Sequence, residues 1–241
     1  MNQDLSGKRA VVTGASRGIG RAICESLHDA GAEIIPVARA SEAMDDLAAS
    51  FSERCTPWTG DAGSDALLDF IANQERIDIL VNNVGINIPK PMTDVTDEDL
   101  DRMLDLNVRT TYRVSRATLG VMPSGGRIVH ISSQMGHVGS PKRTVYCMTK
   151  HAIEGLTKAM AVELAEKGIR VNSVAPTFVE TPMTKPMLAD PEFSAFVKRM
   201  IPLGTVASTE DIAEAVLYLC GPAGKMITGH SLVVDGGWTA Q

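Results

Sequence analysis

A tyrosine and a lysine stand four residues apart in the stretch YCMTK, as Tyr146 and Lys150. On a helix this spacing stacks the phenol and the ammonium on one face, one turn apart. A phenol with a pKa of about 10 is poorly matched to proton transfer at neutral pH, and a nearby ammonium favours its ionised form. The pair can therefore act as an acid–base couple. For the pentapeptide alone, the commoner explanation is an amphipathic helix with a solvated lysine.

A glycine-rich segment, TGASRGIG (Thr13–Gly20), follows a short apolar stretch and opens an amphipathic one. Glycines let the backbone turn tightly and approach a ligand closely. The N-terminus of a following helix offers free N–H groups to a pyrophosphate. Because glycine clusters occur in many turns, the position at the first strand–helix junction is what predicts a dinucleotide site.

The end of the second predicted strand, VARAS, indicates which dinucleotide binds. NAD sites usually place an acidic residue there to hold the ribose 2′-hydroxyl. Here Ala38 stands at that place, Arg39 follows, and Glu42 is the first acid after it. Arg17 lies inside the glycine-rich turn, and two guanidiniums can clasp a 2′-phosphate. We therefore predict NADP(H) as the preferred cofactor, with NAD(H) as the alternative; two merely solvated arginines are the non-functional explanation.

Apolar segments of strand length alternate with segments of helical periodicity along the chain. Strands are predicted at 9–14, 32–39, 55–58, 77–83, 126–133, 169–176 and 230–237. Helices are predicted at 18–31, 43–51, 65–73, from about 96 onward, 146–167 and 209–220. Strands that are apolar throughout indicate a parallel sheet covered on both faces. The predicted fold is α/β: one doubly wound parallel sheet (a Rossmann fold) with helices on both faces, forming a single domain over residues 1–241.

Composition indicates an ordinary globular chain of 241 residues, 44% apolar and 22% charged. A net charge of −6 argues against nucleic acid or an anionic membrane as the main partner. No apolar run approaches the roughly 20 residues that span a bilayer, and the start has no apolar signal core. We therefore expect a cytoplasmic protein. The four cysteines, which form no CxxC pair, are expected to be buried and reduced, and the five histidines form no HxxxH pair, so no metal site is expected.

The order and spacing of the motifs resemble the short-chain dehydrogenase/reductase family from end to end. TGASRGIG, NNVG (Asn82–Gly85), Ser133 at the end of IVHISS, and Tyr146 with Lys150 carry the resemblance. It implies an NAD(P)-dependent oxidoreductase acting on CH–OH and C=O groups. Tyr146 would protonate the carbonyl oxygen as hydride arrives, and Lys150 would hold the nicotinamide ribose and lower the phenol's pKa.

The resemblance also implies roles for residues outside that pair. Ser133 would hydrogen-bond the substrate oxygen. Asn107, in DLNV near the end of the preceding helix, would support a water that relays protons. The implied cofactor-binding residues are Gly14, Ser16, Arg17, Gly18, Ile19, Gly20, Arg39, Asp61, Asn83, Gly85, Tyr146, Lys150, Pro176, Val179 and Thr181. The implied substrate-binding residues are Ser133, Gln134, Arg143, Tyr146 and Met183.

Two segments are expected to form the walls of the substrate cleft. In the family, the stretch between Ser133 and Tyr146 runs along one wall, where Gln134 and Arg143 would suit hydroxyls or an acid group. The proline-broken stretch 177–203 is expected to be a substrate lid that orders when ligand binds, with Met183 as apolar cover. Solvent exposure or core packing is the alternative for each of these side chains.

Within the family, the opening LSGKRAVVTGASRGIGR, the APT turn and LADPEF look most like the L-xylulose (dicarbonyl) reductases, and sugar and polyol dehydrogenases share much of the pattern. The chain has Pro176-Thr177 where the family usually has Pro-Gly. The expected activity is NADPH-dependent carbonyl reduction of a small polar ketone, keto-sugar or dicarbonyl, by a homotetramer. Three alternatives stay open: an NAD-dependent sugar, polyol or hydroxy-acid dehydrogenase, a 3-oxoacyl-carrier-protein reductase, and a non-catalytic dinucleotide sensor.

Overall fold

One parallel sheet runs through the protein, seen in a computed structural model that describes residues 3–51 and 53–241. Within these residues its seven strands lie in the order β3-β2-β1-β4-β5-β6-β7. They are β1 (Arg9–Thr13), β2 (Glu33–Ala38), β3 (Trp58–Thr59), β4 (Ile79–Asn82), β5 (Arg127–Ile131), β6 (Arg170–Pro176) and β7 (Ser231–Val234). Since β1 pairs with both β2 and β4, the chain reverses its winding direction at β1. This confirms the predicted doubly wound α/β fold.

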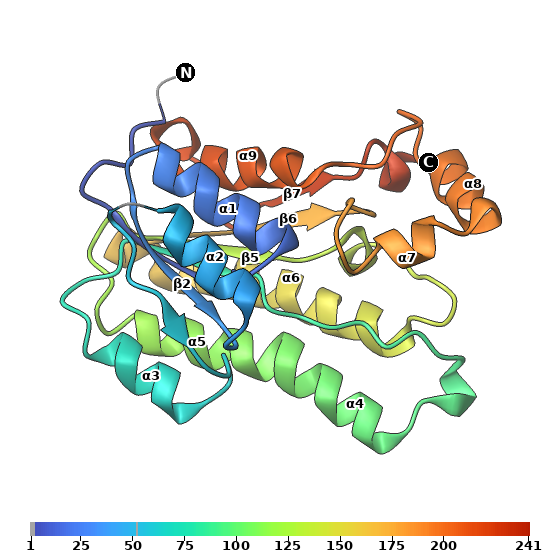
Figure 1. Ribbon diagram of the computed structural model, residues 1–241, viewed down its shortest axis with the longest axis horizontal. Coiled ribbons are helices and arrows are strands. Elements are labelled where there is room, and N and C mark those ends of the chain that lie inside the picture. The colour runs from blue at the N-terminus through green and yellow to red at the C-terminus, as the bar shows by residue number, and fades with distance from the viewer. Residues whose placement is uncertain (1–2, 52) are drawn as a thin grey trace.

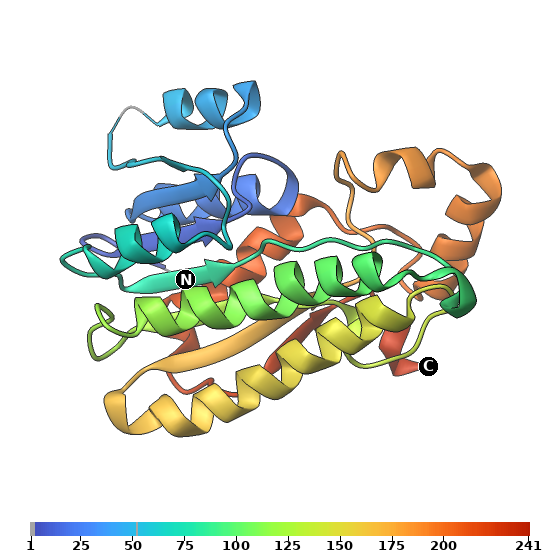
Figure 2. The same ribbon diagram turned by 90° about the horizontal axis from the view of Figure 1, so that it is seen from below.

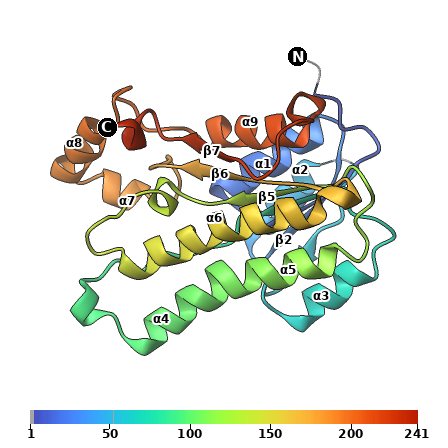
Figure 3. The same ribbon diagram turned by 180° about the vertical axis from the view of Figure 1, so that it is seen from behind.

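Helices cover both faces of the sheet (Figures 1 and 2). One layer contains α1 (Gly18–Asp29), α2 (Glu42–Ser50) and α9 (Thr209–Cys220). The other contains α3 (Asp65–Ala72), α4 (Asp97–Leu104), α5 (Thr110–Thr118) and α6 (Thr144–Leu164). Figure 3 shows α5 and α6 side by side on that face. Two shorter helices, α7 (Lys185–Leu188) and α8 (Pro191–Met200), lie beyond the carboxyl end of β6.

Each face of the sheet has its own hydrophobic cluster, and the two clusters take alternate residues of the same strand. In β1, Ala10 and Val12 pack into the cluster under α1 and α9, while Val11 packs into the cluster under α3 and α5. Successive strand side chains point to opposite faces, so a strand buried on both faces must be apolar at every position. The continuous apolar strands of the sequence have this physical cause.

Several predicted boundaries move in the structure, and two of these shifts are instructive. The helix expected to begin at Tyr146 begins at Thr144, which puts Tyr146 in its first turn. The strand expected at 55–58 is only Trp58–Thr59, with an isolated bridge between Ile34 and Cys55. Pro57 separates the two pieces, and proline has no N–H to donate to a sheet ladder.

The helix predicted from about residue 96 starts as expected but runs much further. The Thr96 hydroxyl accepts from the backbone N–H of Asp99, and the Asp99 carboxylate accepts from the N–H of Thr96. After α4, a π-helical turn (Asp105–Arg109) leads directly into α5. The prediction that Asn107 lies near the end of a helix was therefore wrong: it lies inside the π-turn, in the middle of the helical segment.

Burial of the cysteines follows the prediction in two of four cases. Cys24 and Cys220 are buried, whereas Cys55 and Cys147 are partly exposed. Cys55 precedes the short edge strand β3, and Cys147 lies in the first turn of α6, so neither is enclosed by two layers. All four are free thiols. In the described ranges, no helix combines the length and the apolar character that a membrane crossing requires.

Replacing Leu80 by Ala tests the two-faced burial of the sheet. Leu80 is fully buried at the centre of β4, and its loss leaves a cavity, so we expect the free energy of unfolding to fall by about 2–5 kcal/mol. The same substitution at Leu203, which is 77% exposed, is the control and should change it by less than about 0.5 kcal/mol. Urea unfolding of both variants measures this. Equal losses would contradict the description of the core.

Candidate active site

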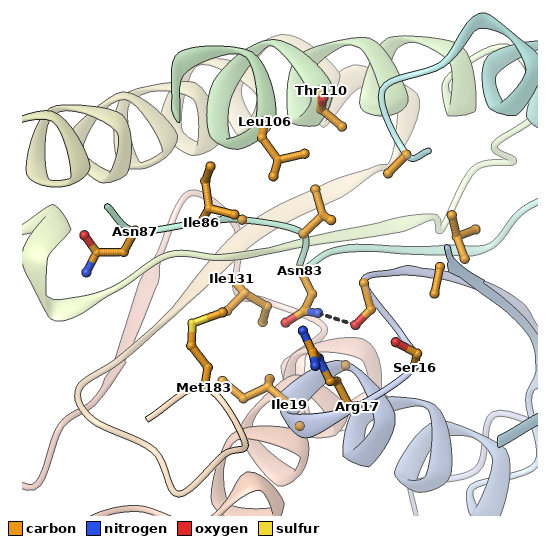
Figure 4. Close-up of a pocket in the computed structure, with 18 of the residues that line it drawn as sticks. Ser16, Arg17, Ile19, Asn83, Ile86, Asn87, Leu106, Thr110, Ile131 and Met183 are labelled. Atoms are coloured by element: carbon orange, nitrogen blue, oxygen red, sulfur yellow. Dashed lines mark hydrogen bonds between the residues drawn. The ribbon is translucent and has the colours of Figure 1, made fainter. Parts of the chain in front are cut away.

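A cleft of about 1320 Å³ opens at the carboxyl ends of the strands. It is lined by the segments that follow β1, β2, β4, β5 and β6, and by one face of the α4–α5 helical segment. Figure 4 shows Ser16 and Arg17 from the glycine-rich turn, Asn83 and Ile86 from the segment after β4, and Met183 from the stretch after β6. The cavity thus lies at the carboxyl ends of the strands, where doubly wound folds bind their ligands.

Most of the predicted site residues meet in this cleft. It is lined by Gly14, Ser16, Arg17, Gly18, Ile19, Gly20, Arg39, Asp61, Asn83, Gly85, Ser133, Tyr146, Lys150, Pro176, Val179, Thr181 and Met183. Asn107, Gln134 and Arg143 are not among its lining residues. The roles assigned to these residues stay predictions, and their placement supplies the geometry for the proposal below.

The glycine-rich turn is held so tightly that one position excludes any side chain. A Cβ atom on Gly20 would lie 2.2 Å from the carbonyl oxygen of Gly14 and 2.6 Å from Asn83 Nδ2. Asn83 Nδ2 donates to the carbonyl oxygens of Thr13 (3.0 Å) and Gly14 (3.1 Å), which ties the turn to the end of β4 (Figure 4). Gly14 itself has φ +68°, a backbone conformation that glycine adopts without strain.

The first turn of α1 suits an anionic group. Its N-cap residue, Arg17, makes no side-chain capping hydrogen bond, and the turn contains no acidic residue. The free N–H groups and the positive end of the helix dipole are therefore left for a ligand. Together with the backbone cradle around Gly20, this fits the pyrophosphate of a dinucleotide.

The cleft is basic at the end next to β2. Arg17 and Arg39 both line it and are exposed, and within the described part of the chain neither has a carboxylate within 4.0 Å. Glu42, the first acid after β2, begins α2 and lies outside the lining. Asp61 lines the cleft, with one oxygen accepting from the Gly63 N–H at 2.7 Å.

Ser133, Tyr146 and Lys150 come together where β5 ends and α6 begins. Ser133 lies two residues after β5, and Tyr146 and Lys150 lie one helical turn apart. Lys150 Nζ donates to the carbonyl oxygen of Ile131 at 2.9 Å and lies 5.5 Å from the centroid of the Tyr146 ring. The four-residue spacing thus has the geometry that it predicted.

Burial shifts both groups of this pair away from their charged forms. It raises the pKa of Tyr146 to about 12, against the opposing effects of the Ser133 hydroxyl and the Arg143 guanidinium. It lowers the pKa of Lys150 to about 8, against the Glu154 carboxylate. The lowered phenol pKa expected from the resemblance is therefore absent in the protein alone, because desolvation outweighs the effects of the Ser133 hydroxyl and the Arg143 guanidinium.

Asn107 acts on the cleft through the backbone rather than by lining it. Its Oδ1 accepts from the N–H of Ile86 at 2.8 Å, and its Nδ2 donates to the Ile86 carbonyl (2.9 Å) and to Thr149 Oγ1 (3.1 Å). The π-turn brings this amide inward, as π-turns often do at functional sites. Asn107 thereby joins the loop after β4 to α6, next to Lys150.

Two predicted substrate residues are placed differently from expectation. Gln134 is buried, and its Oε1 accepts a hydrogen bond from Ser133 Oγ at 2.8 Å, so it contacts the serine instead of forming an open wall. Arg143 is the N-cap residue of α6, and its Nη1 donates to the Lys142 carbonyl at 3.2 Å. Met183, in contrast, is 63% exposed and lines the cleft.

Sequence reasoning missed one wall of the cleft. The α4–α5 segment contributes Arg102, Asp105, Leu106, Arg109, Thr110 and Arg113. These positions recur at intervals of three and four residues and thus form one face of a helix. This periodicity could have indicated a cleft-lining helix face, but the residues form no short motif that identifies it in the sequence.

Known proteins match the chain along its whole length. The family model described as enoyl-(acyl carrier protein) reductase matches residues 14–239. L-xylulose reductase of Bos taurus is 38% identical over 243 residues, covering 100% of both chains. A 3-oxoacyl-[acyl-carrier-protein] reductase of Rickettsia bellii is 35% identical, covering 97% of this chain and 98% of its own. A solved putative NAD(P)-dependent gluconate 5-dehydrogenase of Beutenbergia cavernae, with bound NADP, has a TM-score of 0.93 at 34% identity, covering 100% of both chains.

Replacing Gly20 by Ala tests whether the glycine-rich turn binds the pyrophosphate of the cofactor. The added methyl group collides with the Gly14 carbonyl, and the turn must open, which costs about 1–3 kcal/mol and weakens NADPH binding roughly 5- to 150-fold. Gly155, on α6, has no atom within 4 Å of its Cβ position, so Gly155→Ala is the matched control and should leave the Kd unchanged. Titration of nicotinamide fluorescence gives both constants. An unchanged Kd in the Gly20 variant would contradict the assignment.

Proposed function

The chain belongs to the short-chain dehydrogenase/reductase family and is an NAD(P)-dependent oxidoreductase, and from this premise we propose that it uses NADPH to reduce a small polar ketone, keto-sugar or dicarbonyl. One observation carries the proposal: Ser133, Tyr146 and Lys150 line the same cleft as the glycine-rich turn. The full-length similarity to an L-xylulose reductase supports the choice of substrate class. The bound NADP of the gluconate 5-dehydrogenase structure supports the choice of cofactor.

NADPH, when bound, supplies the hydride that adds to the carbonyl carbon. The glycine-rich turn and the first turn of α1 would hold the pyrophosphate, and Lys150 would donate to the nicotinamide ribose. Arg17 and Arg39, free of carboxylate partners within the described ranges, would bind the 2′-phosphate.

Proton transfer in this direction requires a protonated phenol. The Tyr146 hydroxyl, with its pKa of about 12, is protonated at neutral pH and ready to donate to the carbonyl oxygen as negative charge develops there. The resulting phenolate is stabilised by the Lys150 ammonium, 5.5 Å from the ring centroid. The Ser133 hydroxyl, which donates to Gln134 Oε1 in the protein alone, must turn toward the substrate oxygen to assist.

Reduction of a 3-oxoacyl thioester on a carrier protein is a second candidate. The Rickettsia bellii relative favours it, and exposed Lys142 next to Arg143 offers some basic surface for an acidic carrier. Both candidates use the same cofactor site and the same tyrosine, so only the substrate distinguishes them.

Loss of NADPH absorbance with L-xylulose, diacetyl and an acetoacetyl thioester tests the function. We expect turnover with the first two, and turnover with the thioester alone would favour the second candidate. Tyr146→Phe removes the transferable proton and should lower kcat by roughly 100-fold or more. Full activity of this variant would contradict the mechanism. Tyr112→Phe, which changes a half-exposed phenol on α5, is the matched control.

Replacing Arg39 by Ala tests the cofactor preference. Loss of one charge-assisted contact to the 2′-phosphate, worth about 1.5 kcal/mol, should raise the KM for NADPH roughly tenfold. NADH, which has a hydroxyl in place of that phosphate, is the internal control and should keep its KM. Steady-state kinetics with both cofactors measure these KM values. An equal change in KM for NADPH and NADH would contradict the binding of the 2′-phosphate by Arg39.

A further inference from the structure

Glu154 is a buried carboxylate that the proposed mechanism does not use. It lies on α6 one helical turn after Lys150, on the side of the helix that packs against β6 (Figure 3). Only 5% of the residue is exposed. Burial of a carboxylate is costly unless hydrogen bonds or opposite charges compensate it, so its presence at this depth needs a physical reason.

Its direct partners compensate the carboxylate only in part. Ser173 Oγ donates to one oxygen, Oε2, at 2.8 Å. The other oxygen, Oε1, is buried and accepts no hydrogen bond from any described residue. The nearest cationic candidate for it is His137, whose Nε2 lies 3.6 Å away and also bonds to Ser231 Oγ at 2.9 Å. One hydrogen bond from a serine compensates only a small part of the cost of burying a charge.

Lys150 is the buried cation on the same side of α6. Its amine is fixed by the Ile131 carbonyl at 2.9 Å, and the titratable groups facing it are Tyr146, Glu154 and, from β5, His130. Burial and the Lys150 charge lower the pKa of His130 to about 3, so that ring is neutral. Tyr146, with a pKa of about 12, is likewise uncharged at neutral pH. The Glu154 carboxylate is thus the anion that raises the pKa of Lys150 against the effect of burial.

We propose that Glu154 is a positioning residue of the active site, a buried anion that keeps the Lys150 amine charged while the amine serves the nicotinamide ribose and the phenol. The inference rests on the proposed function, because Lys150 is needed in its charged form only if the site carries out hydride transfer. The simpler explanation is that the hydrogen bond between Ser173 and Glu154 stabilises the packing of α6 against β6. The two explanations differ in whether the charge or the hydrogen bond matters.

Glu154→Gln separates them because it keeps size and hydrogen-bonding capacity and removes the charge. Lys150 and Glu154 lie one helical turn apart and form no ion pair within 4.0 Å among the described residues, so we expect loss of the charge to lower the pKa of Lys150 by about one unit. The alkaline limb of kcat/KM should then move about one unit toward lower pH. The activity of the variant relative to wild type should then be near one at pH 6 and about tenfold lower at pH 9. Diacetyl reduction at saturating NADPH is the assay.

Ser173→Ala is the matched control, since it removes the hydrogen bond and leaves the charge. It should leave the alkaline limb in place. Glu154→Asp, which withdraws the carboxylate by one methylene, should move the limb in the same direction as Gln but less, and it serves as the test if the Gln variant does not fold. A loss of activity that is equal at every pH would overturn the inference in an active enzyme. A wild-type chain that reduces no carbonyl would refute the proposed function, and this inference with it.

Discussion

The Nζ atom of Lys150 lies inside the protein, 2.9 Å from the Ile131 carbonyl oxygen, where β5 ends and α6 passes over the sheet. Its surroundings explain much of the local architecture. A Cβ on Gly85 would lie 3.7 Å from this amine, an ordinary contact, and 3.2 Å from Asn107 Oδ1, which would have to shift by a few tenths of an ångström. A buried ammonium needs hydrogen bonds and a neighbouring anion, and the carbonyl of Ile131 and the carboxylate of Glu154 meet those needs.

The parallel sheet explains why the chemistry collects at one edge. Strands buried on both faces accept few polar side chains along their length, so polar groups gather where the strands end. Thr13 and Asn83 join the ends of β1 and β4 by hydrogen bonds of 3.0 Å, and Ser133 follows β5. His130 in β5 and Asn172 and Ser173 in β6 are buried exceptions, and the His130 ring bonds to Asn82 Nδ2 at 3.1 Å. The His130 ring is neutral, so Lys150 is the cation in this region.

The stretch after β6 makes aromatic contacts with Trp238 near the C-terminus. Phe178 lies 5.9 Å from Trp238 and 5.5 Å from Phe193 between ring centroids, and Phe196 lies 6.2 Å from Trp238. Figure 1 shows α7, α8 and the C-terminus together beyond the sheet. Met183 projects toward the cleft from this stretch (Figure 4). Met183 therefore belongs to a segment that is packed against the C-terminus by its aromatic residues.

Features that depend on neighbours along the chain could be predicted from the sequence. The strand–helix alternation, the glycine-rich turn, the Thr96 cap and the Tyr146–Lys150 spacing each depend on local sterics and helical periodicity. Features that depend on which distant elements pack together could not. Tertiary packing brings Gln134 into hydrogen-bond contact with Ser133 and directs the Asn107 amide toward the backbone of Ile86. It also places the helix face that contains Leu106 along the cleft. The raised pKa of Tyr146 also belongs to this group, because desolvation is set by everything that surrounds the phenol.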